Sequence, residues 1–209
     1  MKDLKYMKLV SPTGRLILAT PQVEDDLAVS ILRSDPAVLR YLAGVIPDVC
    51  EIEDARQLRE ARSQDKQTCD FYIHLLEDDS PKFVGMTGIF KISDAHRSCE
   101  VGILISPQVH GQGIATEALY TALNFAFAER GMHRVTAQTS AANQPMRKWF
   151  EEVAGATVDG RMRDAWSTAP GKYVDTIVYG ILEDEWRDVI KSKLEAKMTK
   201  EKGGGKTTA

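Results

Sequence analysis

The chain has 209 residues, of which 43% are hydrophobic, and this is enough for one domain around a single core. Its formal net charge of −3 excludes a general polyanion binder, so we expect no nucleic-acid partner. The charge is uneven, because seven Lys/Arg and three Asp/Glu from Arg187 onward leave −7 for the rest of the chain. An acidic body suits a cationic ligand, but it is also common in ordinary cytosolic proteins.

Cysteine and histidine usage points to a cytoplasmic protein without a metal. The three cysteines, Cys50, Cys69 and Cys99, are odd in number and form no Cys-x-x-Cys pair, which is typical of reduced thiols. The four histidines show no ligand spacing, so no metal site is expected. The opening MKDLKYMKLV has no signal-peptide core and no apolar run is long enough for a bilayer, so we expect no membrane partner.

The first third of the chain predicts one strand and three helices. The strand covers residues 15–19, and a helix over residues 22–33 follows it with Val23, Leu27 and Ile31 in one helical phase. Two further helices are predicted over residues 36–42 and 51–66, the second with Ile52, Ala55, Leu58 and Ala61 in phase.

The middle of the chain reads as three consecutive strands. They are predicted over residues 71–76, 83–92 and 98–105, separated by the turn Asp78-Asp79-Ser80-Pro81 and by a hairpin connection over residues 94–97.

The third of these strands runs into a glycine-rich loop, HGQGIATEA, and then into a predicted helix over residues 116–130. Gly111 and Gly113 lack a Cβ atom, so the backbone can curl and approach an anion closely. The N–H groups of the first helical turn have no intrahelical partner and lie at the positive end of the helix dipole. The pattern indicates a phosphate site, although a tight loop without a ligand has the same pattern. A dinucleotide fingerprint needs a third glycine where Thr116 stands, and no Lys-Ser/Thr follows as in a P-loop.

The last third predicts strands, one short helix and a helical extension. Asn143 is a plausible N-cap for a helix that reaches Val153, after a strand over residues 134–139. Strands are predicted over residues 157–163 and 172–179 with a connection over 164–171, then a helix over 182–198 with Trp186, Ile190 and Leu194 in phase. That apolar stripe packs on the domain or on a partner, and residues 199–209 are expected to be a disordered tail.

The glycine loop resembles the signature of the GNAT family of N-acetyltransferases. That signature is Gln/Arg-x-x-Gly-x-Gly/Ala; Gly113 and Ala115 meet it, whereas His110 replaces the opening Gln or Arg. The segments 14–42, 84–93 and 143–164 are similar to the Rim-type branch, and the resemblance covers about residues 9–182. It implies an α/β (α+β) fold: a mixed, mostly antiparallel sheet of six to seven strands, splayed at a central V and flanked by about four helices plus a C-terminal helix. We therefore expect an acetyltransferase domain over residues 1–182 and a helical extension over residues 183–198.

The resemblance also implies how acetyl-CoA is bound. Its pantetheine lies along the strand with Ile103, Leu104 and Ile105, in the gap toward the strand over residues 134–139. The diphosphate lies on the loop, which involves His110, Gly111, Gln112, Gly113, Ile114, Ala115 and Thr116. Asn143 resembles the asparagine that meets the pantetheine arm, although an N-cap role competes with this, and Arg147 could reach a CoA phosphate or lie in solvent.

Glu100 is the candidate general base. It lies near the start of the cofactor strand, where GNAT enzymes often carry a glutamate that deprotonates the amine through water; the alternative is a glutamate that faces solvent. Met146 replaces the serine that protonates the thiolate in some relatives, so Tyr173, Tyr179 or water remain as candidate acids. Aromatic residues expected near the acceptor, or else in the core, are Tyr41, Phe71, Tyr72, Trp166 and Tyr173, with Arg163 beside them.

The resulting hypothesis is an acetyl-CoA-dependent N-acetyltransferase. Its acceptor is a primary amine on a small molecule, a protein N-terminus or a lysine, attacked directly in a ternary complex. The alternative is a catalytically weak GNAT-fold module that binds CoA as a sensor or assembly partner, which Met146 and His110 favour. The stripe on the last helix allows a homodimer.

Overall fold

The protein folds around one eight-stranded sheet. The computed structural model describes residues 7–42, 44–77 and 80–204, and its strand order is β1-β2-β3-β4-β5-β6-β8-β7. The pairing of β5 with β6 is parallel and the other pairings are antiparallel. The predicted fold class is confirmed, but the sheet has more strands than the six or seven expected.

The extra strand is β1 (Lys8–Val10), which pairs with β2 (Leu16–Ala19). It is too short and too exposed to show an apolar alternation, so its sequence does not predict a strand. A 3-10 turn (Val23–Asp25) leads into α1 (Asp26–Arg33), and α2 (Pro36–Leu39) and α3 (Ile52–Gln64) follow.

The helix predicted over residues 22–33 is present as the 3-10 turn and α1, but its three apolar residues in one phase do not form its buried face. Val23, Leu27 and Ile31 are 58%, 55% and 63% exposed, whereas Asp26 is buried. Asp26 turns inward because its carboxylate accepts two hydrogen bonds from Arg59 of α3, at 2.8 and 2.9 Å. An ion pair with this bidentate geometry offsets the cost of burying the carboxylate, and the buried face of α1 consists of Asp26, Val29, Ser30 and Leu32.

The helix predicted over residues 51–66 is confirmed as α3, but the apolar set in phase along it is only partly buried. Ala55 is its one buried member, and Ile52 is 51% exposed. Arg62 forms an ion pair with Asp70 of β3, so polar contacts as well as packing hold this helix to the sheet.

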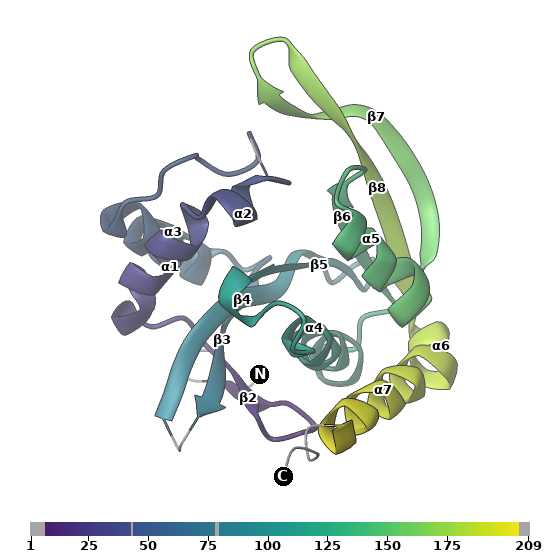
Figure 1. Cartoon of the computed structure of the whole chain (residues 1–209). Coiled ribbons are helices and arrows are strands. Elements are labelled where there is room, and N and C mark those ends of the chain that lie inside the picture. Colours follow the sequence, from purple (N-terminus) through teal and green to yellow (C-terminus); the bar gives the residue numbers. More distant parts are fainter. Residues whose placement is uncertain (1–6, 43, 78–79, 205–209) are drawn as a thin grey trace.

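The centre of the sheet consists of β3 (Cys69–Glu77), β4 (Ser80–Ser93) and β5 (Ser98–Ile105). One face packs on α4 (Ile114–Asn124), which a π turn (Phe125–Glu129) continues. The opposite face meets α1 and α3 through a smaller apolar cluster that contains Val29, Ala55 and Tyr72. Figure 1 shows α4 and the group α1–α3 on different sides of the central strands.

The C-terminal half adds β6 (Arg134–Ser140), α5 (Gln144–Lys148) with its π extension (Trp149–Ala154), and the hairpin of β7 (Thr157–Ala169) and β8 (Lys172–Leu182). Residues 164–169, predicted as part of a connection, belong to β7, and the hairpin projects far beyond β6 (Figure 1). Three register shifts along β7 and the positive φ of Asp164 (51°) interrupt its alternation, which explains why the sequence pattern ends early.

The chain then enters α6 (Glu183–Glu185), a π turn (Trp186–Ile190) and α7 (Lys191–Gly204). The predicted stripe is confirmed and packs on the domain itself, since Trp186, Ile190, Leu194 and Met198 are buried in the main core. The helix continues to Gly204, past the expected end at Met198, and residues 205–209 of the expected tail lie outside the described residues. Within the described ranges, no helix is long and apolar enough to cross a membrane.

Candidate functional site

The two central strands part at Glu100. β5 pairs with β6 over Ser98–Glu100 alone, where Glu100 lies opposite Thr136. Beyond that point β5 stays paired with β4 as far as Ile105, while β6 follows β8. The backbone of residues 101–105 on the β6 side therefore borders a V-shaped opening, and an extended ligand could pair with it as an added strand.

The glycine loop lies at the open end of this V. After Ile105 a 3-10 turn (Pro107–Val109) leads to Gly111 and Gly113, whose φ values of 76° and 77° fall in the left-handed region. α4 begins at the next residue, Ile114, so its first-turn N–H groups face the loop. This backbone forms a concave set of donors at the positive end of a helix dipole, which suits a phosphate.

The side chains of the loop contribute less than the sequence suggests. Ile114 is buried in the core, and the buried hydroxyl of Thr116 accepts a hydrogen bond from Trp149 Nε1 at 3.1 Å. These two residues can offer a ligand only their backbone N–H groups. His110 is exposed, and its Nε2 lies 3.2 Å from the carbonyl oxygen of Ile105.

Asn143 and Arg147 lie on the β6–α5 side of the V. Asn143 is buried: its Oδ1 accepts from the backbone N–H of Met146 at 3.3 Å, and its Nδ2 donates to Thr139 Oγ1 at 2.9 Å. Its expected N-cap role is thus present in the structure. Arg147 donates to the carbonyl oxygen of Ala141 at 3.2 Å and pairs with Glu151 at 3.3 Å.

Glu100 lies at the apex of the V. Because side chains alternate along a strand, it shares a face with Gly102 and Leu104, on the side of the sheet where α1 and α3 pack. Its side chain is 17% exposed, and Oε2 lies 2.8 Å from Lys91 Nζ. The carboxylate is therefore neither free in solvent nor without a partner.

The candidate acids and aromatic residues separate into buried and exposed groups. Tyr179 is buried, stacks on Phe150 at 4.9 Å, and donates its hydroxyl to Glu151 at 2.7 Å. The pKa of Tyr179 is raised to about 12, and burial is the largest cause of this shift. Tyr173 is 57% exposed near the hairpin end, whereas Phe71 belongs to the core beside Phe125.

The loop after α2 touches the end of the β7–β8 hairpin. A Cβ atom at Gly44 would lie 1.8 Å from the carbonyl oxygen of Ser167, so the two backbones meet directly. Trp166, the residue before Ser167 on β7, is half-buried.

Sequence reasoning missed three residues around the loop: Arg15, Glu117 and Trp149. Glu117 is a charged residue that is 1% exposed within an otherwise apolar helix, and such a residue needs a partner. The sequence does show a glutamate among apolar helix residues, which could have been noticed, but it does not reveal which residue would pair with it.

The comparison with models of protein families identifies the family of this chain. A family model described as "Acetyltransferase (GNAT) domain" matches residues 15–154. The chain belongs to the GNAT acetyltransferase family. The resemblance that the glycine loop indicated is therefore confirmed.

Relatives of known sequence agree with this membership. An uncharacterized N-acetyltransferase p20 from Bacillus licheniformis is 26% identical over 176 residues, which is 83% of this chain and 96% of the relative. A spermidine N(1)-acetyltransferase from Vibrio cholerae is 25% identical over 112 residues, 54% of this chain and 64% of the relative.

Solved structures share the fold. Spermidine N-acetyltransferase from Vibrio cholerae, in complex with CoA and spermine, has a TM-score of 0.74 at 20% identity and covers 83% of this chain and 99% of its own. Mycobacterium smegmatis RimJ in complex with CoA-disulfide has a TM-score of 0.74 at 22% identity, and the match covers 92% of this chain and 94% of RimJ.

Proposed function

We propose that this protein transfers the acetyl group of acetyl-CoA to a primary amine of a small cationic molecule, by direct attack in a ternary complex. The observation that carries the proposal is the parting of β5 and β6 at Glu100, with the glycine loop at the other end of the same strand segment. Family membership and a spermidine-acetylating relative support the reaction class and the amine.

The donor is held along β5 in this proposal. The diphosphate takes the N–H groups of the loop and of the first turn of α4, while the pantetheine amides pair with the backbone of Ile103, Leu104 and Ile105. Five strand residues at about 3.3 Å each separate Glu100 from the end of β5, a span of about 17 Å that an extended pantetheine arm bridges. The thioester then lies near the apex of the V.

The acceptor enters beside Glu100, on the side of the sheet that faces α1 and α3. An alkylamine is almost fully protonated at neutral pH, since its pKa is about 10.4, so the reaction needs a base. Glu100 accepts the proton through water, and the nitrogen lone pair forms a bond to the thioester carbon. The C–S bond of the resulting tetrahedral intermediate breaks, and water passes the second proton of the attacking nitrogen to the CoA thiolate, so that the amide and the CoA thiol are the products.

Small amines are favoured over protein acceptors by one backbone contact and by the charge of the chain. The contact of Gly44 with Ser167 joins the loop after α2 to the hairpin end, and this narrows the approach for a bulky acceptor. The −7 charge of the chain before Arg187 also attracts a cation.

A CoA-binding module without transfer is the second candidate. The observation that favours it is the ion pair between Glu100 and Lys91, because a carboxylate that holds an ammonium has one partner already. In that case the protein binds CoA but turns over no amine.

The test measures acetyl-CoA binding by calorimetry and CoA release with spermidine, spermine and peptides bearing a free N-terminus or a lysine. We expect binding and turnover with the polyamines, and a rate for Glu100→Gln lower by roughly 10²–10⁴-fold. Glu77→Gln is the matched control, since Glu77 is an exposed strand glutamate with a lysine partner, Lys82, at 4.0 Å. Binding without turnover on any amine would establish the module, and no binding would overturn both readings.

A further inference from the structure

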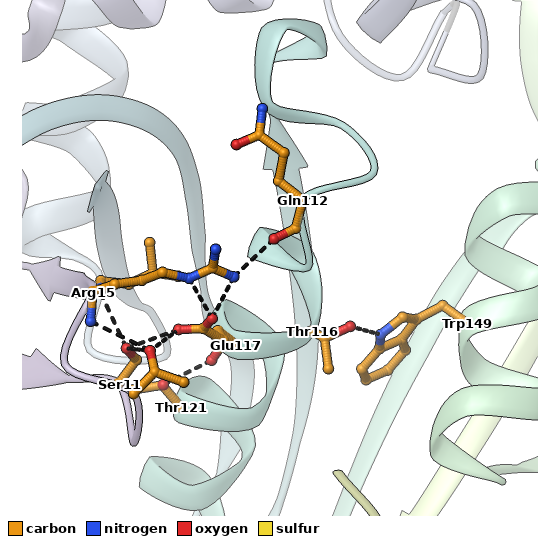
Figure 2. Close-up of polar contacts among 9 residues, drawn as sticks. Ser11, Arg15, Gln112, Thr116, Glu117, Thr121 and Trp149 are labelled. Carbon is orange, nitrogen blue, oxygen red and sulfur yellow. Dashed lines mark hydrogen bonds and ion pairs between the residues drawn. The ribbon is translucent and has the colours of Figure 1, made fainter. Parts of the chain in front are cut away.

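Arg15 connects the start of β2 with the glycine loop. Its Nη2 donates to the carbonyl oxygen of Gln112 at 2.8 Å, and its Nε donates to Glu117 Oε1 at 2.6 Å (Figure 2). One guanidinium thus bridges a loop peptide and a carboxylate in the first turns of α4. A planar guanidinium with donors in a fixed geometry suits such a bridge, whereas an ammonium offers only a point charge.

Glu117 anchors this arginine. Its side chain is 2% exposed, Oε1 meets Arg15, and Oε2 accepts from the hydroxyls of Ser11 at 3.0 Å and Thr13 at 2.5 Å. A buried carboxylate is tolerated when it is paired and fully hydrogen-bonded. The four residues therefore form one polar cluster between the β1–β2 turn and α4.

The bond to Gln112 sets the orientation of the next peptide group. In a trans peptide the C=O of one residue and the N–H of the next point in opposite directions. Because the Gln112 carbonyl points to Arg15, the N–H of Gly113 points away from Arg15, to the other side of the loop. The left-handed φ of Gly113 (77°) allows this turn of the chain.

Arg15 also alters the charge that a diphosphate meets. Glu117 lies one helical turn from the loop, and its negative charge opposes an anion there. The adjacent guanidinium neutralises it, and because its side chain is 38% exposed, part of its field reaches solvent.

We propose that Arg15, held by Glu117, is a positioning residue for the diphosphate of acetyl-CoA: it orients the Gln112–Gly113 peptide and cancels the charge of Glu117. This inference rests on the proposed function, in which that loop binds the diphosphate. It assigns to Arg15 a role through the loop backbone and no contact with the reacting atoms.

The experiment compares two acetyl donors, acetyl-CoA and acetyl-pantetheine, which carries the same thioester but no nucleotide or diphosphate. Loss of a charge-assisted hydrogen bond changes affinity by roughly tenfold, so in Arg15→Gln we expect kcat/KM for acetyl-CoA to fall about tenfold. The kcat/KM for acetyl-pantetheine should stay within about twofold of the wild type, because this donor does not use the loop. A general loss of structure would lower both values together.

Arg97→Gln is the matched control. Arg97 makes the same kind of bridge near the other end of the same helical segment, donating to the carbonyl oxygen of Gly131 at 2.7 Å and to Glu183 at 3.0 Å. Its replacement should leave the ratio between the two donors unchanged. If Arg15→Gln does not fold, Arg15→Lys keeps a positive charge beside Glu117, and we expect it to fold and to show a smaller selective loss, because it loses the bridge to the Gln112 carbonyl but still cancels the charge of Glu117.

The outcomes separate this inference from the proposed function. Wild-type protein that binds acetyl-CoA, with the same donor ratio in Arg15→Gln or Arg15→Lys, overturns the role of Arg15 alone. Wild-type protein that binds no acetyl-CoA overturns the proposed function and this inference with it. A selective loss for acetyl-CoA supports both.

Discussion

The carboxylate of Glu100 lies 2.8 Å from the ammonium of Lys91, one register position beyond the pair Phe90–Glu100. Lys91 stands at a strand irregularity with φ of 53°, and its side chain is 68% exposed. The ion pair therefore lies where a cationic acceptor has to approach the proposed base. An incoming amine and Lys91 compete for the same oxygen atoms.

This competition predicts that Lys91→Asn lowers the KM for the amine. An exposed ion pair is worth up to about 1 kcal/mol, so the decrease should be roughly two- to fivefold. Asparagine is chosen because it tolerates a left-handed backbone. Initial rates over a range of spermidine concentrations check this, and Lys82→Asn, which removes an ion pair at the far end of β4, should change nothing. An increased KM in Lys91→Asn would show that the lysine assists the acceptor.

Tyr179→Phe tests whether this hydroxyl acts as an acid. The hydrogen bond from Tyr179, with Arg147 nearby, holds the pKa of Glu151 below its usual range. A carboxyl with a lowered folded-state pKa stabilises the fold above its ordinary pKa, and this contribution is lost as the pH falls through the lowered value. Tyr179→Phe should thus be less stable than wild type at pH 7, with a smaller difference below about pH 4.

Urea midpoints at both pH values measure that stability difference, and kcat measures the acid role. We expect kcat to be unchanged, because the Tyr179 proton is engaged with Glu151. A large decrease in kcat without any loss of stability would assign Tyr179 to catalysis.

The strand β5 and the loop after it could be predicted because their local chemistry agrees with the fold. The bounds of β5 match the expected Ser98–Ile105, and the two glycines stand where positive φ is needed. Family resemblance added the V between the strands, which no local pattern contains. These parts of the site depend mainly on backbone geometry, and backbone geometry follows glycine spacing and apolar alternation.

Contacts between distant segments could not be predicted. Asp26 of α1 is buried where Arg59, 33 residues later, pairs with it, and Glu117 meets Arg15 from 102 residues away. A helix with apolar residues in more than one phase does not reveal from its sequence which of them face the core. In α1 the buried face combines Asp26 with the apolar Val29 and Leu32, and Leu27 and Ile31 remain exposed.

The C-terminal helix predicts a contrast between two neighbouring apolar residues. Leu194 is fully buried in the main core, whereas Val189 is 59% exposed. Leu194→Ala should lower the free energy of unfolding by about 2–5 kcal/mol, because it leaves a cavity, and Val189→Ala should change it by less than about 0.5 kcal/mol. Denaturant titration checks both. Equal effects would mean that α7 does not pack on the core as described.

The buried thiols of Cys69 and Cys99 predict that neither of these residues carries the acetyl group during transfer. Burial raises the pKa of Cys69 to about 11 and that of Cys99 to about 12, so both are protonated thiols at neutral pH. A protonated, buried thiol is a poor nucleophile. Mass spectrometry after incubation with acetyl-CoA should find neither residue acetylated, and iodoacetamide should modify them only after unfolding. An acetylated Cys69 or Cys99 would contradict direct transfer.

Gly111 and Gly131 share a left-handed backbone conformation, so substitutions at the two positions distinguish an effect on ligand binding from an effect on folding. Gly111 and Gly131 have φ of 76° and 63°, and a Cβ atom built on either would meet no protein atom within 4 Å. Alanine at each position should therefore cost a similar conformational penalty, about 1–2 kcal/mol.

The two glycines differ in their distance from the proposed diphosphate site. Gly111 lies in the loop before α4, whereas Gly131 lies beyond the far end of that helical segment. In Gly111→Ala the new methyl group stands where the diphosphate approaches, so the Kd for acetyl-CoA should rise by roughly tenfold or more, and in Gly131→Ala it should not change. Calorimetric titration measures the Kd of both variants, once denaturation curves have shown that their midpoints are similar. Equal affinity in the two would place the diphosphate away from Gly111.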